Sequence, residues 1–450
     1  MDAYDVIVVG AGPGGSTAAT FLAAAGRKVL VLDKKAFPRP KVCGDGLTPR
    51  SVRILDEIGL GDQVRTYHRV KGLRLLAAGG KVMELDFPPT SGFAPLGFVR
   101  PRKNLDDEMG AAARAAGAEY RTKTEAVAPV FDGRTVAGVR WVRKEPAEGG
   151  GVVKAEEGEV RAPFTIVADG ASSSFGRALG IRRRPDYPLG LALRTYYTSP
   201  RHRDDYFEAW LDLKSNDRIL PGYGWIFPVG DGTVNVGVGL LATMAKREVN
   251  LIRLQRGYVD MLPSWYEIGH DGQTQPYKSG RLPLGGSVGK PHGDGYVLIG
   301  DAAGMINPFT GEGIAYAMET GKLAASQIDA ALEAGGTTEL ASYREALRDI
   351  YGAYYRLGRS FDRVLSNPQA AKLLISTGMR SRPIMEFTFQ LMLNLREESG
   401  GTLIDRGFRS LIRLASFRLS QLKDPEIPAP RRRATAAAGT AAEADRAGAA

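Results

Sequence analysis

The sequence has 450 residues, of which 43% are hydrophobic and 24% are charged, a composition typical of globular proteins with two or three domains. Its formal net charge of +10 suits an acidic partner such as nucleic acid, an anionic membrane surface or a phosphorylated substrate, and it equally suits a basic surface that only keeps the protein soluble. The single cysteine, Cys43, excludes a disulfide framework and a metal or iron–sulfur site built from cysteines, and no metal is expected.

The N-terminus and the hydropathy pattern bear on where the protein acts. The first residues, Met-Asp-Ala-Tyr-Asp, are acidic and lack the cationic start and the cleavage signal of a secretory peptide. No run of about 18 apolar residues is present, so no spanning helix is expected. These features predict a cytoplasmic protein whose membrane contact is peripheral, on the inner face of the cell membrane.

The first motif in the chain is a strand–turn–helix–strand unit. Its parts, in order, are residues 5–9, Gly10, Gly12, Gly15, 16–25, 28–32 and Asp33. In this G-x-G-x-x-G spacing Gly10 makes the tight turn, Gly12 lets backbone approach a pyrophosphate, and Gly15 allows close helix–strand packing. Asp33 can accept a hydrogen bond from a ribose 2′-hydroxyl, so the pattern predicts a dinucleotide site rather than a glycine-rich turn in another α/β protein. The neighbouring residues expected to line it are Ala11, Pro13, Gly14 and Lys34.

Two later motifs separate FAD from NAD. A strand at 296–300 ends on Asp301, and a glycine-rich loop and a long Ala-rich helix follow; this resembles the second FAD motif of flavoproteins related to aromatic hydroxylases. Asp301 can hold the ribityl chain, and the helix N-terminus can face the N1 and O2 edge of a flavin. A third motif closes the strand at 164–167, with Arg177 just downstream. The predicted cofactor is therefore FAD, and the further residues expected to contact it are Ala126, Asp169, Gly170, Gly300, Asp301, Pro308, Gly311, Gly313 and Ile314.

No second free-standing glycine fingerprint follows a strand, so no separate NADPH domain is expected. The electron donor stays open between NAD(P)H and a reduced carrier.

Two further segments resemble the geranylgeranyl reductase family. They are Pro-Arg-Pro-Lys-Val-Cys-Gly-Asp-Gly-Leu-Thr-Pro-Arg at 38–50 and Leu-Pro-Gly-Tyr-Gly-Trp-Ile-Phe-Pro at 220–228, with Asn-Val-Gly at 235–237. The resemblance runs from the N-terminus to about residue 420. Within the family, the Cys-Gly-Asp-Gly-Leu-Thr-Pro-Arg stretch is most similar to bacterial menaquinone reductases, which saturate one isoprene unit of the quinone tail. The resemblance implies an FAD-dependent reductase that acts on an isoprenoid lipid or quinone.

Such chemistry delivers a hydride from reduced FAD and a proton to an unactivated alkene, and it needs a dry apolar site with a proton source nearby. Cys43 follows the second predicted strand, in a loop that can reach the flavin in this fold class. Its thiol is a candidate weak acid or gate residue, and the alternative is a small side chain that packs against the isoalloxazine. Gly44, Asp45 and Gly46 are expected to supply backbone contacts to flavin or substrate.

Tyr223, Trp225 and Phe227 alternate as one face of a strand would, and with Pro228 they are candidates for the wall of an isoprenoid tunnel. Tyr223 and Trp225 are also candidate catalytic residues. The alternative is an ordinary sheet core. The same string partly resembles the W-x-W-x-I-P motif of flavin-dependent halogenases, but Tyr223 and Phe227 depart from it. The family resemblance also implies that Arg102 approaches the FAD pyrophosphate, the alternative being a solvated charge at a helix start.

The expected fold class is α/β, or α+β overall, with an FAD-binding Rossmann-like domain of the aromatic-hydroxylase type, an antiparallel-sheet substrate domain and C-terminal helices. The expected boundaries are 1–70, 100–190 and 275–345 for the discontinuous FAD-binding domain, 71–99 and 191–274 for the substrate domain, 346–425 for the helical region and 426–450 for a disordered tail.

Residues 406–423 interleave basic and apolar side chains, most of the apolar ones at helical spacing. Two interpretations remain: a basic amphipathic helix lying on an anionic bilayer, or a helix packed on the protein with its basic side in solvent.

Three other functions stay open at this point. The first is reduction of geranylgeranyl diphosphate or a geranylgeranyl lipid. The second is an FAD-dependent monooxygenase, which would use the same frame with NADPH and oxygen. The third is a non-catalytic flavoprotein that binds quinone and needs no proton donor. No nucleic-acid partner is expected.

Overall fold

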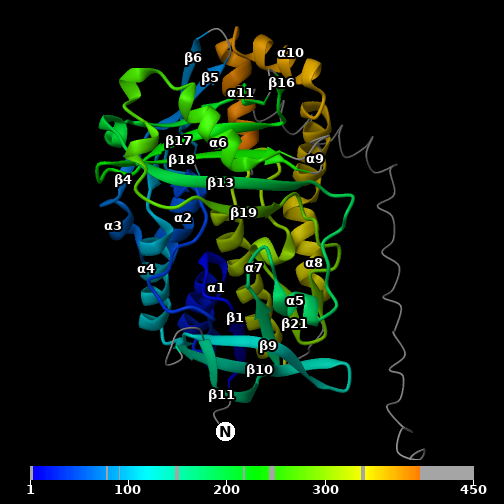
Figure 1. The fold of residues 1–450 in the computed structure, drawn as a ribbon. Helices are drawn as coiled ribbons and strands as arrows, with labels where there is room; N and C mark the ends of the chain where they lie inside the picture. Colours follow the sequence, from blue (N-terminus) through cyan, green and yellow to red (C-terminus); the bar gives the residue numbers. More distant parts are fainter. Residues whose placement is uncertain are drawn as a thin grey trace, which may run out of the picture.

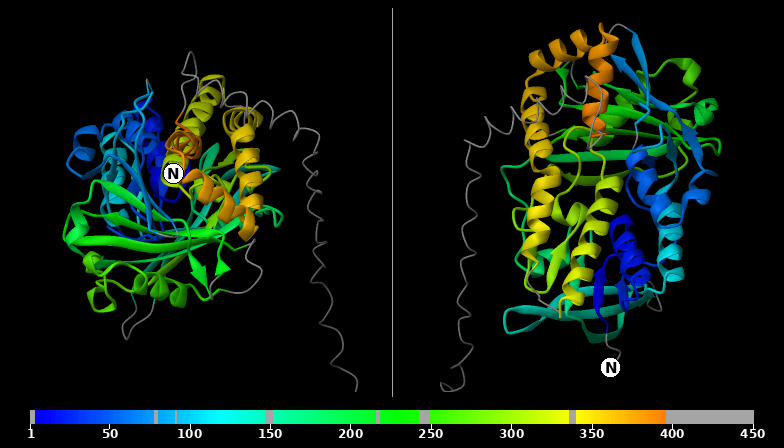
Figure 2. Two further views of the ribbon diagram at one scale, coloured as in Figure 1. Left: turned by 90° about the horizontal axis from the view of Figure 1, so that it is seen from above. Right: turned by 180° about the vertical axis from the view of Figure 1, so that it is seen from behind.

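The computed structural model describes residues 4–77, 80–90, 92–146, 152–215, 218–242, 249–335 and 340–395. In these parts of the chain a mostly parallel sheet occupies the middle of the molecule (Figure 1). A small antiparallel sheet closes one end, and a larger sheet lies toward the other end. The last helices run along one side and cover that second end (Figure 2).

The central sheet has the strand order β20-β21-β12-β1-β2-β8. Its strands are β1 (Val6–Val9), β2 (Val29–Leu32), β8 (Glu119–Arg121), β12 (Phe164–Val167), β20 (His292–Gly293) and β21 (Tyr296–Leu298). β1, β2 and β12 are buried along their whole length, and they are continuous apolar runs except for Thr165 in β12. All strands except β20 are parallel, so their carboxyl ends meet at one edge, where Gly10, Asp33 and Asp301 follow three of them.

Two small-residue helices pack closely beside this sheet. They are α1 (Pro13–Ala24) and α7 (Ile314–Glu333), and α1 also contacts α4 (Arg102–Ala115). A Cβ atom on Gly321 of α7 would lie 2.4 Å from the carbonyl oxygen of Gly14, so glycine is what lets α1 and α7 approach. The shorter helices of this half are α2 (Pro49–Glu57), α3 (Gly61–Val64) and α5 (Ser174–Ala178), with the 3₁₀ turn η4 (Gly300–Ala303).

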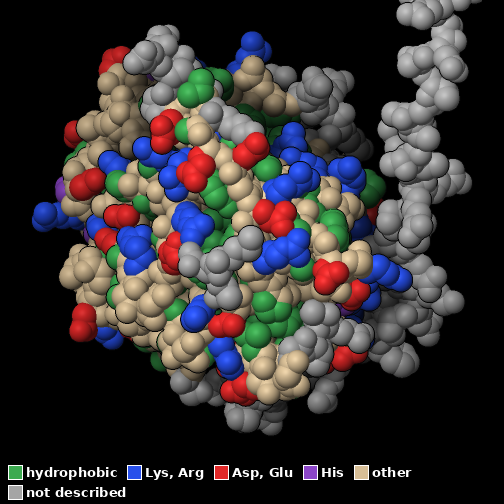
Figure 3. Space-filling view, turned by 90° about the horizontal axis from the view of Figure 1, so that it is seen from below, with side chains coloured by type: hydrophobic (Ala, Val, Ile, Leu, Met, Phe, Trp, Pro, Cys, Tyr) green, Lys and Arg blue, Asp and Glu red, His purple; other side chains and the backbone are tan. Residues whose placement is uncertain are grey.

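The small sheet consists of β9 (Thr124–Asp132), β10 (Thr135–Pro146) and β11 (Val152–Arg161), all antiparallel. It lies across the lower end of the molecule in Figure 1. Seen from below, this end carries Lys and Arg side chains interspersed with Asp and Glu (Figure 3).

The large sheet has the order β19-β13-β18-β17-β14-β5-β6. Its strands are β5 (Gly72–Ala77), β6 (Lys81–Asp86), β13 (Leu189–Thr198), β14 (Tyr206–Trp210), β17 (Gly222–Pro228), β18 (Thr233–Leu241) and β19 (Lys278–Pro283). Every pairing is antiparallel, as expected, except that β14 and β5 run parallel. The parallel pair arises because the chain reaches β14 only after it has left the β5–β6 hairpin and passed through the central domain. β19 joins this sheet, although its residues lie in the segment 275–345 assigned above to the other domain.

Shorter elements complete this part of the chain. β3 (Gly46–Leu47), β7 (Gly97–Val99) and β4 (His68–Val70) form a three-stranded sheet, and β15 (Lys214–Ser215) pairs with β16 (Arg218–Ile219). The remaining elements before residue 290 are η1 (Pro200–Arg203), α6 (Leu251–Asp260), η2 (Ser264–Tyr266) and η3 (His270–Gly272).

From residue 341 to 393 the chain forms consecutive helices with short breaks, in keeping with the predicted C-terminal helices. These helices are α8 (Ala341–Leu347), the π-helical η5 (Arg348–Gly352), α9 (Ala353–Leu365), α10 (Pro368–Gly378) and α11 (Arg382–Leu393). Side chains of α10 and α11 share a core cluster with β5, β6, β14 and β17, so they cover one face of the large sheet. None of the helices in the described ranges is both long and apolar enough to span a bilayer. The segments predicted as an amphipathic helix, 406–423, and as a tail, 426–450, lie outside the described residues.

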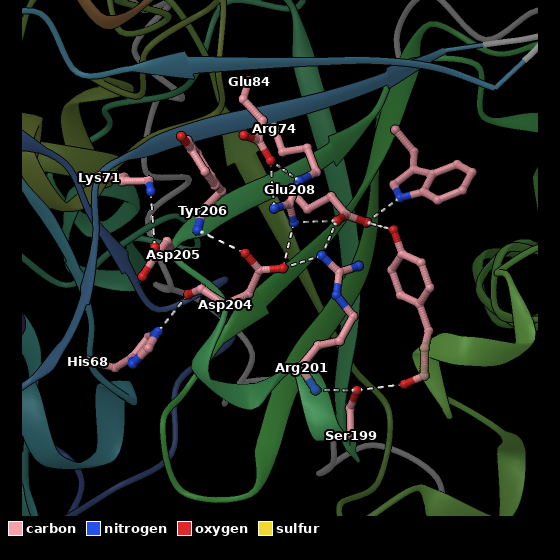
Figure 4. A network of polar contacts seen from close by, with 12 residues as sticks. His68, Lys71, Arg74, Glu84, Ser199, Arg201, Asp204, Asp205, Tyr206 and Glu208 are labelled. Carbon is pink, nitrogen blue, oxygen red and sulfur yellow. Dashed lines mark hydrogen bonds and ion pairs between the residues drawn. The ribbon is translucent and has the colours of Figure 1, made fainter.

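A buried ion-pair cluster fastens the large sheet to the segment before β14 (Figure 4). Glu208 on β14 is only 1% exposed, and its carboxylate contacts the guanidinium groups of Arg201 at 2.9 Å and Arg74 at 3.4 Å. Asp204 bridges the same two arginines. Because each charge has an opposite partner, this cluster is a structural one, and it lies outside the sequence predictions.

Candidate active site

Four glycines shape the turn between β1 and α1. Gly10 has a φ of +104°, and a Cβ on Gly15 would lie 1.9 Å from the Gly10 carbonyl oxygen, so the predicted tight turn and close helix–strand packing are both present. A Cβ on Gly14 would lie 2.8 Å from the backbone of α7. Gly12 differs, because a Cβ there would meet only the Arg39 guanidinium, at 4.0 Å. The space beside Gly12 is therefore the one that the turn leaves for a ligand.

Asp33 holds the two turns of this unit together. Its carboxylate accepts hydrogen bonds from the Ala11 N–H at 2.9 Å and from the Lys35 N–H at 2.8 Å. Arg39 contacts the same carboxylate at 3.3 Å and reaches Asp106 at 3.2 Å with its other terminal nitrogen. Oδ2 accepts from both Ala11 and Arg39, whereas Oδ1 accepts only from Lys35 and keeps a lone pair to which a ribose hydroxyl can still donate.

The opposite wall comes from the segments after β12 and β21. A Cβ on Gly313, the residue that precedes α7, would lie 3.3 Å from Oδ1 of Asp301. Burial raises the pKa of Asp301, and Lys41 and Arg102 oppose that rise. Asp169 accepts a hydrogen bond from the Phe175 N–H at 2.9 Å through Oδ2, whereas its buried Oδ1 has no protein partner.

These observations fit a bound dinucleotide. The open side of Gly12 lies at the N-terminus of α1, where unpaired N–H groups attract a phosphate. The unpartnered Oδ1 of Asp169 can accept a hydrogen bond from a ligand. Asp301 sits beside the start of α7, whose N–H groups can face the electron-rich edge of a flavin. The residues of this chain are therefore suited to FAD.

The loop with the sequence Cys-Gly-Asp-Gly, residues 43–46, is anchored by the side chain of Asp45. Asp45 is fully buried and has a φ of +67°, in the left-handed region. Its carboxylate accepts hydrogen bonds from the Arg102 N–H at 3.1 Å, from the Tyr196 hydroxyl, and from Nδ2 of Asn235 at 2.7 Å. The sequence predicted backbone contacts for this loop but not the anchoring role of the Asp45 side chain.

Asn235 ties this loop to the large sheet. The side chain is fully buried on β18, and its Nδ2 also donates to the carbonyl oxygen of Cys43 at 2.9 Å. Its Oδ1 accepts a hydrogen bond from the indole N–H of Trp225 at 3.0 Å. One amide therefore fixes the position of the thiol-bearing residue relative to the aromatic strand β17.

The Cys43 thiol lies between groups that set its protonation. Burial raises the pKa of Cys43, the nearby Asp45 adds to the rise, and the Arg102 guanidinium opposes it. Arg102 is itself held by Asp106 at 2.6 and 2.9 Å. At neutral pH the thiol therefore carries its proton, and a cation stands beside it that can stabilise a thiolate. The implied contact of Arg102 with a pyrophosphate stays a prediction.

The aromatic residues of β17 form one continuous surface. The ring centroids of Tyr223 and Trp225 are 6.1 Å apart, and those of Trp225 and Phe227 are 6.4 Å apart. Phe227 also contacts Phe207, with a centroid distance of 4.6 Å. A Cβ on Gly44 would lie 2.9 Å from the Phe227 ring, so the 43–46 loop rests directly on this surface. The expected aromatic face is present.

Two glycines and a carboxyl complete this region. A Cβ on Gly237 would lie 2.1 Å from the Trp225 ring, so the indole occupies the space above a glycine of the neighbouring strand. The Tyr223 hydroxyl donates to the carbonyl oxygen of Thr310 at 2.6 Å, which places Tyr223 against the predicted 308–314 loop. In that loop Gly311 has a φ of +73°. Glu312 accepts a hydrogen bond from the Thr48 hydroxyl, and burial raises the pKa of Glu312 to about 7.

The other predicted residues lie in several different loops, strands and helices. Gly170 has a φ of +80°, and the N–H of Gly300 donates to the Thr320 hydroxyl at 3.0 Å. Pro308 packs against Gly358 of α9. The remaining ones are the exposed Lys34, Ala126 in the core of β9, Gly46 against Phe207, Pro228 at the end of β17 and Ile314 at the start of α7.

Several residues of the site were not predicted from the sequence: Arg39, Lys41, Asp106, Tyr196, Asn235 and Glu312. Signals were available for four of them, since Arg39, Lys41 and Asn235 lie in the two family motifs and Glu312 lies between two predicted glycines. In the described residues, no group of His, Cys, Asp and Glu side chains could hold a metal ion.

Comparison with known proteins places this geometry in context. Residues 3–355 match the family model of the FAD binding domain. The chain is 39% identical over 433 residues to a menaquinone reductase of Mycobacterium tuberculosis, covering 95% of this chain and 98% of that protein. It is 31% identical over 358 residues to a digeranylgeranylglycerophospholipid reductase of Methanosarcina acetivorans, covering 79% and 81% of the two chains. A solved geranylgeranyl bacteriochlorophyll reductase-like protein from Thermoplasma acidophilum has a TM-score of 0.69 at 23% identity, covering 94% of this chain and all of that one.

Proposed function

Because this chain belongs to the family of FAD-binding reductases that includes menaquinone reductases and digeranylgeranylglycerophospholipid reductases, we propose that it saturates one isoprene unit of the menaquinone side chain. The fold class, the FAD cofactor and the oxidoreductase class that the sequence predicted are confirmed. The menaquinone substrate is favoured because the similarity to that relative spans nearly the whole of both chains. Reduction of a geranylgeranyl chain on another lipid is the second candidate, supported by the archaeal relative.

The observation that carries the proposal is the position of the protonated Cys43 thiol. The loop bearing it is fixed against the aromatic surface of β17 by Asp45 and Asn235. Reduced FAD, when bound, supplies the hydride for the alkene. Cys43 supplies the proton to the other alkene carbon as or before the hydride arrives, and the adjacent Arg102 stabilises the thiolate that remains. The predicted FAD contacts and catalytic residues are parts of this proposal.

The aromatic surface has two roles in this scheme. Tyr223, Trp225 and Phe227 exclude water from the prenyl chain, which prevents capture of a developing cation by a nucleophile. The faces of the Tyr223 and Trp225 rings also stabilise the positive charge that protonation develops at the neighbouring alkene carbon, the one that receives the hydride. Burial raises the pKa of Tyr223 to about 12, so its hydroxyl stays protonated and holds the Thr310 carbonyl.

The proposed substrate also bears on the membrane and the electron donor with which the protein works. An isoprenoid quinone resides in a membrane, so we propose peripheral association with its anionic inner face. The electron donor is proposed to be NAD(P)H or a reduced carrier.

The test is single-turnover reoxidation of the reduced flavoprotein by menaquinone without oxygen, with the product weighed for two added hydrogens. Cys43→Ala should keep FAD binding and flavin reduction but lower the rate of alkene saturation by about 10²-fold or more, the scale typical for loss of a general acid. Cys43→Ser keeps the size of the side chain but offers a poorer acid, so it should lie close to the Ala variant.

Three other outcomes would each contradict part of the proposal. A wild-type rate in the Ala variant would make Cys43 a packing residue. Saturation of a geranylgeranyl lipid but not of menaquinone would select the second candidate. A hydroxylated product formed only with oxygen would make the protein a monooxygenase.

A further inference from the structure

The end of the molecule formed by α10 and the start of α11 exposes large apolar side chains. Leu373 is 68% exposed, Leu374 is 44% exposed and Ile384 is 50% exposed. Both helices lie at the end of the molecule opposite β9–β11 (Figures 1 and 2). We call this region the α10–α11 surface, defined by Lys372, Leu373, Leu374, Arg380, Arg382 and Ile384.

Basic residues outnumber acids in the segment that carries these apolar residues. From residue 363 to 386 the chain carries four basic residues, all exposed, and one acid. That acid, Glu386, is paired with Arg382 at 2.8 Å. An exposed apolar group within a positively charged surface is complementary to an anionic phospholipid bilayer, in which leucines enter the headgroup boundary and cations contact the phosphates.

Two other groups of exposed apolar residues lack this combination. At the β9–β11 end, Val127 and Phe131 are 44% and 52% exposed, but residues 124–146 and 152–161 contain six acids and six bases. Several of these charges are paired with each other, as in Arg143–Glu156 at 3.1 Å. On η2, Trp265 is 63% exposed, but the Arg201 guanidinium already lies 5.0 Å above its ring.

The inner side of the α10–α11 surface leads toward the proposed substrate site. Ile375, Met379 and Met385 belong to the same core cluster as Tyr223 and Phe227 of the aromatic surface. Ile375 follows Leu374 directly, and Met385 follows Ile384. Along α10 and the start of α11, some apolar side chains therefore face solvent. At the adjacent positions, apolar side chains face the core that contains the aromatic strand β17.

We propose that the α10–α11 surface docks on an anionic phospholipid bilayer, with the β9–β11 end pointing away from the membrane. The use of this contact to take a prenyl lipid from the bilayer rests on the proposed function; the docking itself does not. The surface differs from the segment 406–423 in which the sequence predicted membrane contact.

The experiment measures sedimentation of the full-length, FAD-loaded protein with vesicles of phosphatidylcholine, alone or mixed with phosphatidylglycerol. Leu373→Asn combined with Leu374→Asn should lower partitioning to the anionic vesicles about tenfold or more, because two apolar side chains no longer leave water. Lys372→Gln with Arg380→Gln should lower it by about fivefold per cation. Binding of the wild-type protein should weaken between about 0.1 M and about 1 M salt, as the Debye length falls from about 10 Å to about 3 Å.

A matched control changes the opposite end. Val127→Asn combined with Phe131→Asn removes two apolar residues of similar exposure and should leave partitioning unchanged. Loss of vesicle binding in this control, or unchanged binding in the leucine variant, overturns the proposal. So does a result in which only Arg406→Gln with Arg409→Gln reduces binding. Light scattering measures self-association of the same variants. A leucine variant that loses self-association but still binds vesicles would also overturn the proposal.

An activity arm separates this inference from the proposed function. With a short prenyl substrate dispersed in detergent, the leucine variant should match the wild-type rate, whereas with menaquinone held in vesicles it should be slower by the same factor as its partitioning. If no form of the protein saturates any prenyl chain, yet the leucine variant still loses vesicle binding, the proposed function fails and the docking surface stands.

Discussion

Replacement of Asn235 by alanine is the most informative single test of how the site is held together. The change removes three hydrogen bonds at once: those to the Cys43 carbonyl at 2.9 Å, to Asp45 at 2.7 Å and from Trp225 at 3.0 Å. All three partners lie in or beside the proposed site. The variant therefore asks whether the side chain that connects the 43–46 loop to β17 also fixes the reacting groups.

The size of the effect follows from what each partner loses. The buried indole N–H of Trp225 is left without an acceptor, which costs about 1–3 kcal/mol. Asp45 loses one donor but keeps the Arg102 N–H and the Tyr196 hydroxyl, so its share is smaller. With the void left by the side chain, the free energy of unfolding should fall by about 3–5 kcal/mol. A typical domain has a total of about 5–15 kcal/mol, so the protein should still fold.

The assay is urea unfolding of the flavin-free protein, paired with the single-turnover rate of alkene saturation in the FAD-bound protein. Asn250→Ala is the matched control: this asparagine caps α6 at the surface, and its loss should cost about 1 kcal/mol and leave the rate unchanged. Trp225→Phe in the Asn235→Ala background removes the orphaned donor. The two substitutions should therefore be coupled by about 1–2 kcal/mol in a double-mutant cycle.

Three results would refute this reasoning. One is a cost for Asn235→Ala no larger than that for Asn250→Ala. Another is an unchanged rate of saturation in the Asn235→Ala variant. The third is an equal cost of Trp225→Phe in both backgrounds, because the indole hydrogen bond would then carry no stabilisation.

Three further predictions follow from the same geometry. Gly12→Val should fold but lose FAD, because its side chain enters the open space beside α1. Gly15→Val should not fold, because a Cβ there would lie 1.9 Å from a carbonyl oxygen. Circular dichroism and flavin absorbance separate the two, and a Gly12 variant with full flavin occupancy would contradict the assignment. The rate of alkene saturation should stay level up to about pH 9 and fall only above it, since burial raises the pKa of Cys43 and the donor must be protonated; a fall below pH 8 would mean that another group supplies the proton. Glu312→Gln should leave the flavin-free protein progressively more stable than the wild type as pH rises from 4.5 to about 7, by up to about 3 kcal/mol. The reason is that the pKa of Glu312 is raised in the folded protein, so the unfolded chain loses this proton first and the wild type is destabilised. Urea unfolding at several pH values measures the difference, and a difference that does not change with pH would show that the carboxyl is not desolvated.

The sequence by itself determined the parts of this protein whose physics is local. Gly10, Gly15 and Asp33 act within about 25 residues of one another, and a turn, a helix contact and a strand end are each visible in the spacing of residues. The alternation of Tyr223, Trp225 and Phe227 likewise predicts one face of a strand, because successive side chains of a strand point to opposite sides. Strongly apolar runs identified the buried parallel strands for the same reason.

Only the tertiary structure decided how the Cys43 thiol is held and why it keeps its proton at neutral pH. The hydrogen bonds of Asp45 to Tyr196 and Asn235 join residues 151 and 190 positions apart, and no local pattern encodes such a pairing. The pKa of Cys43 depends on burial and on the distance to Arg102, which exist only once segments that are distant in the sequence have packed together. The parallel pairing of β5 with β14 has the same origin, since it depends on the path of the chain through the whole central domain.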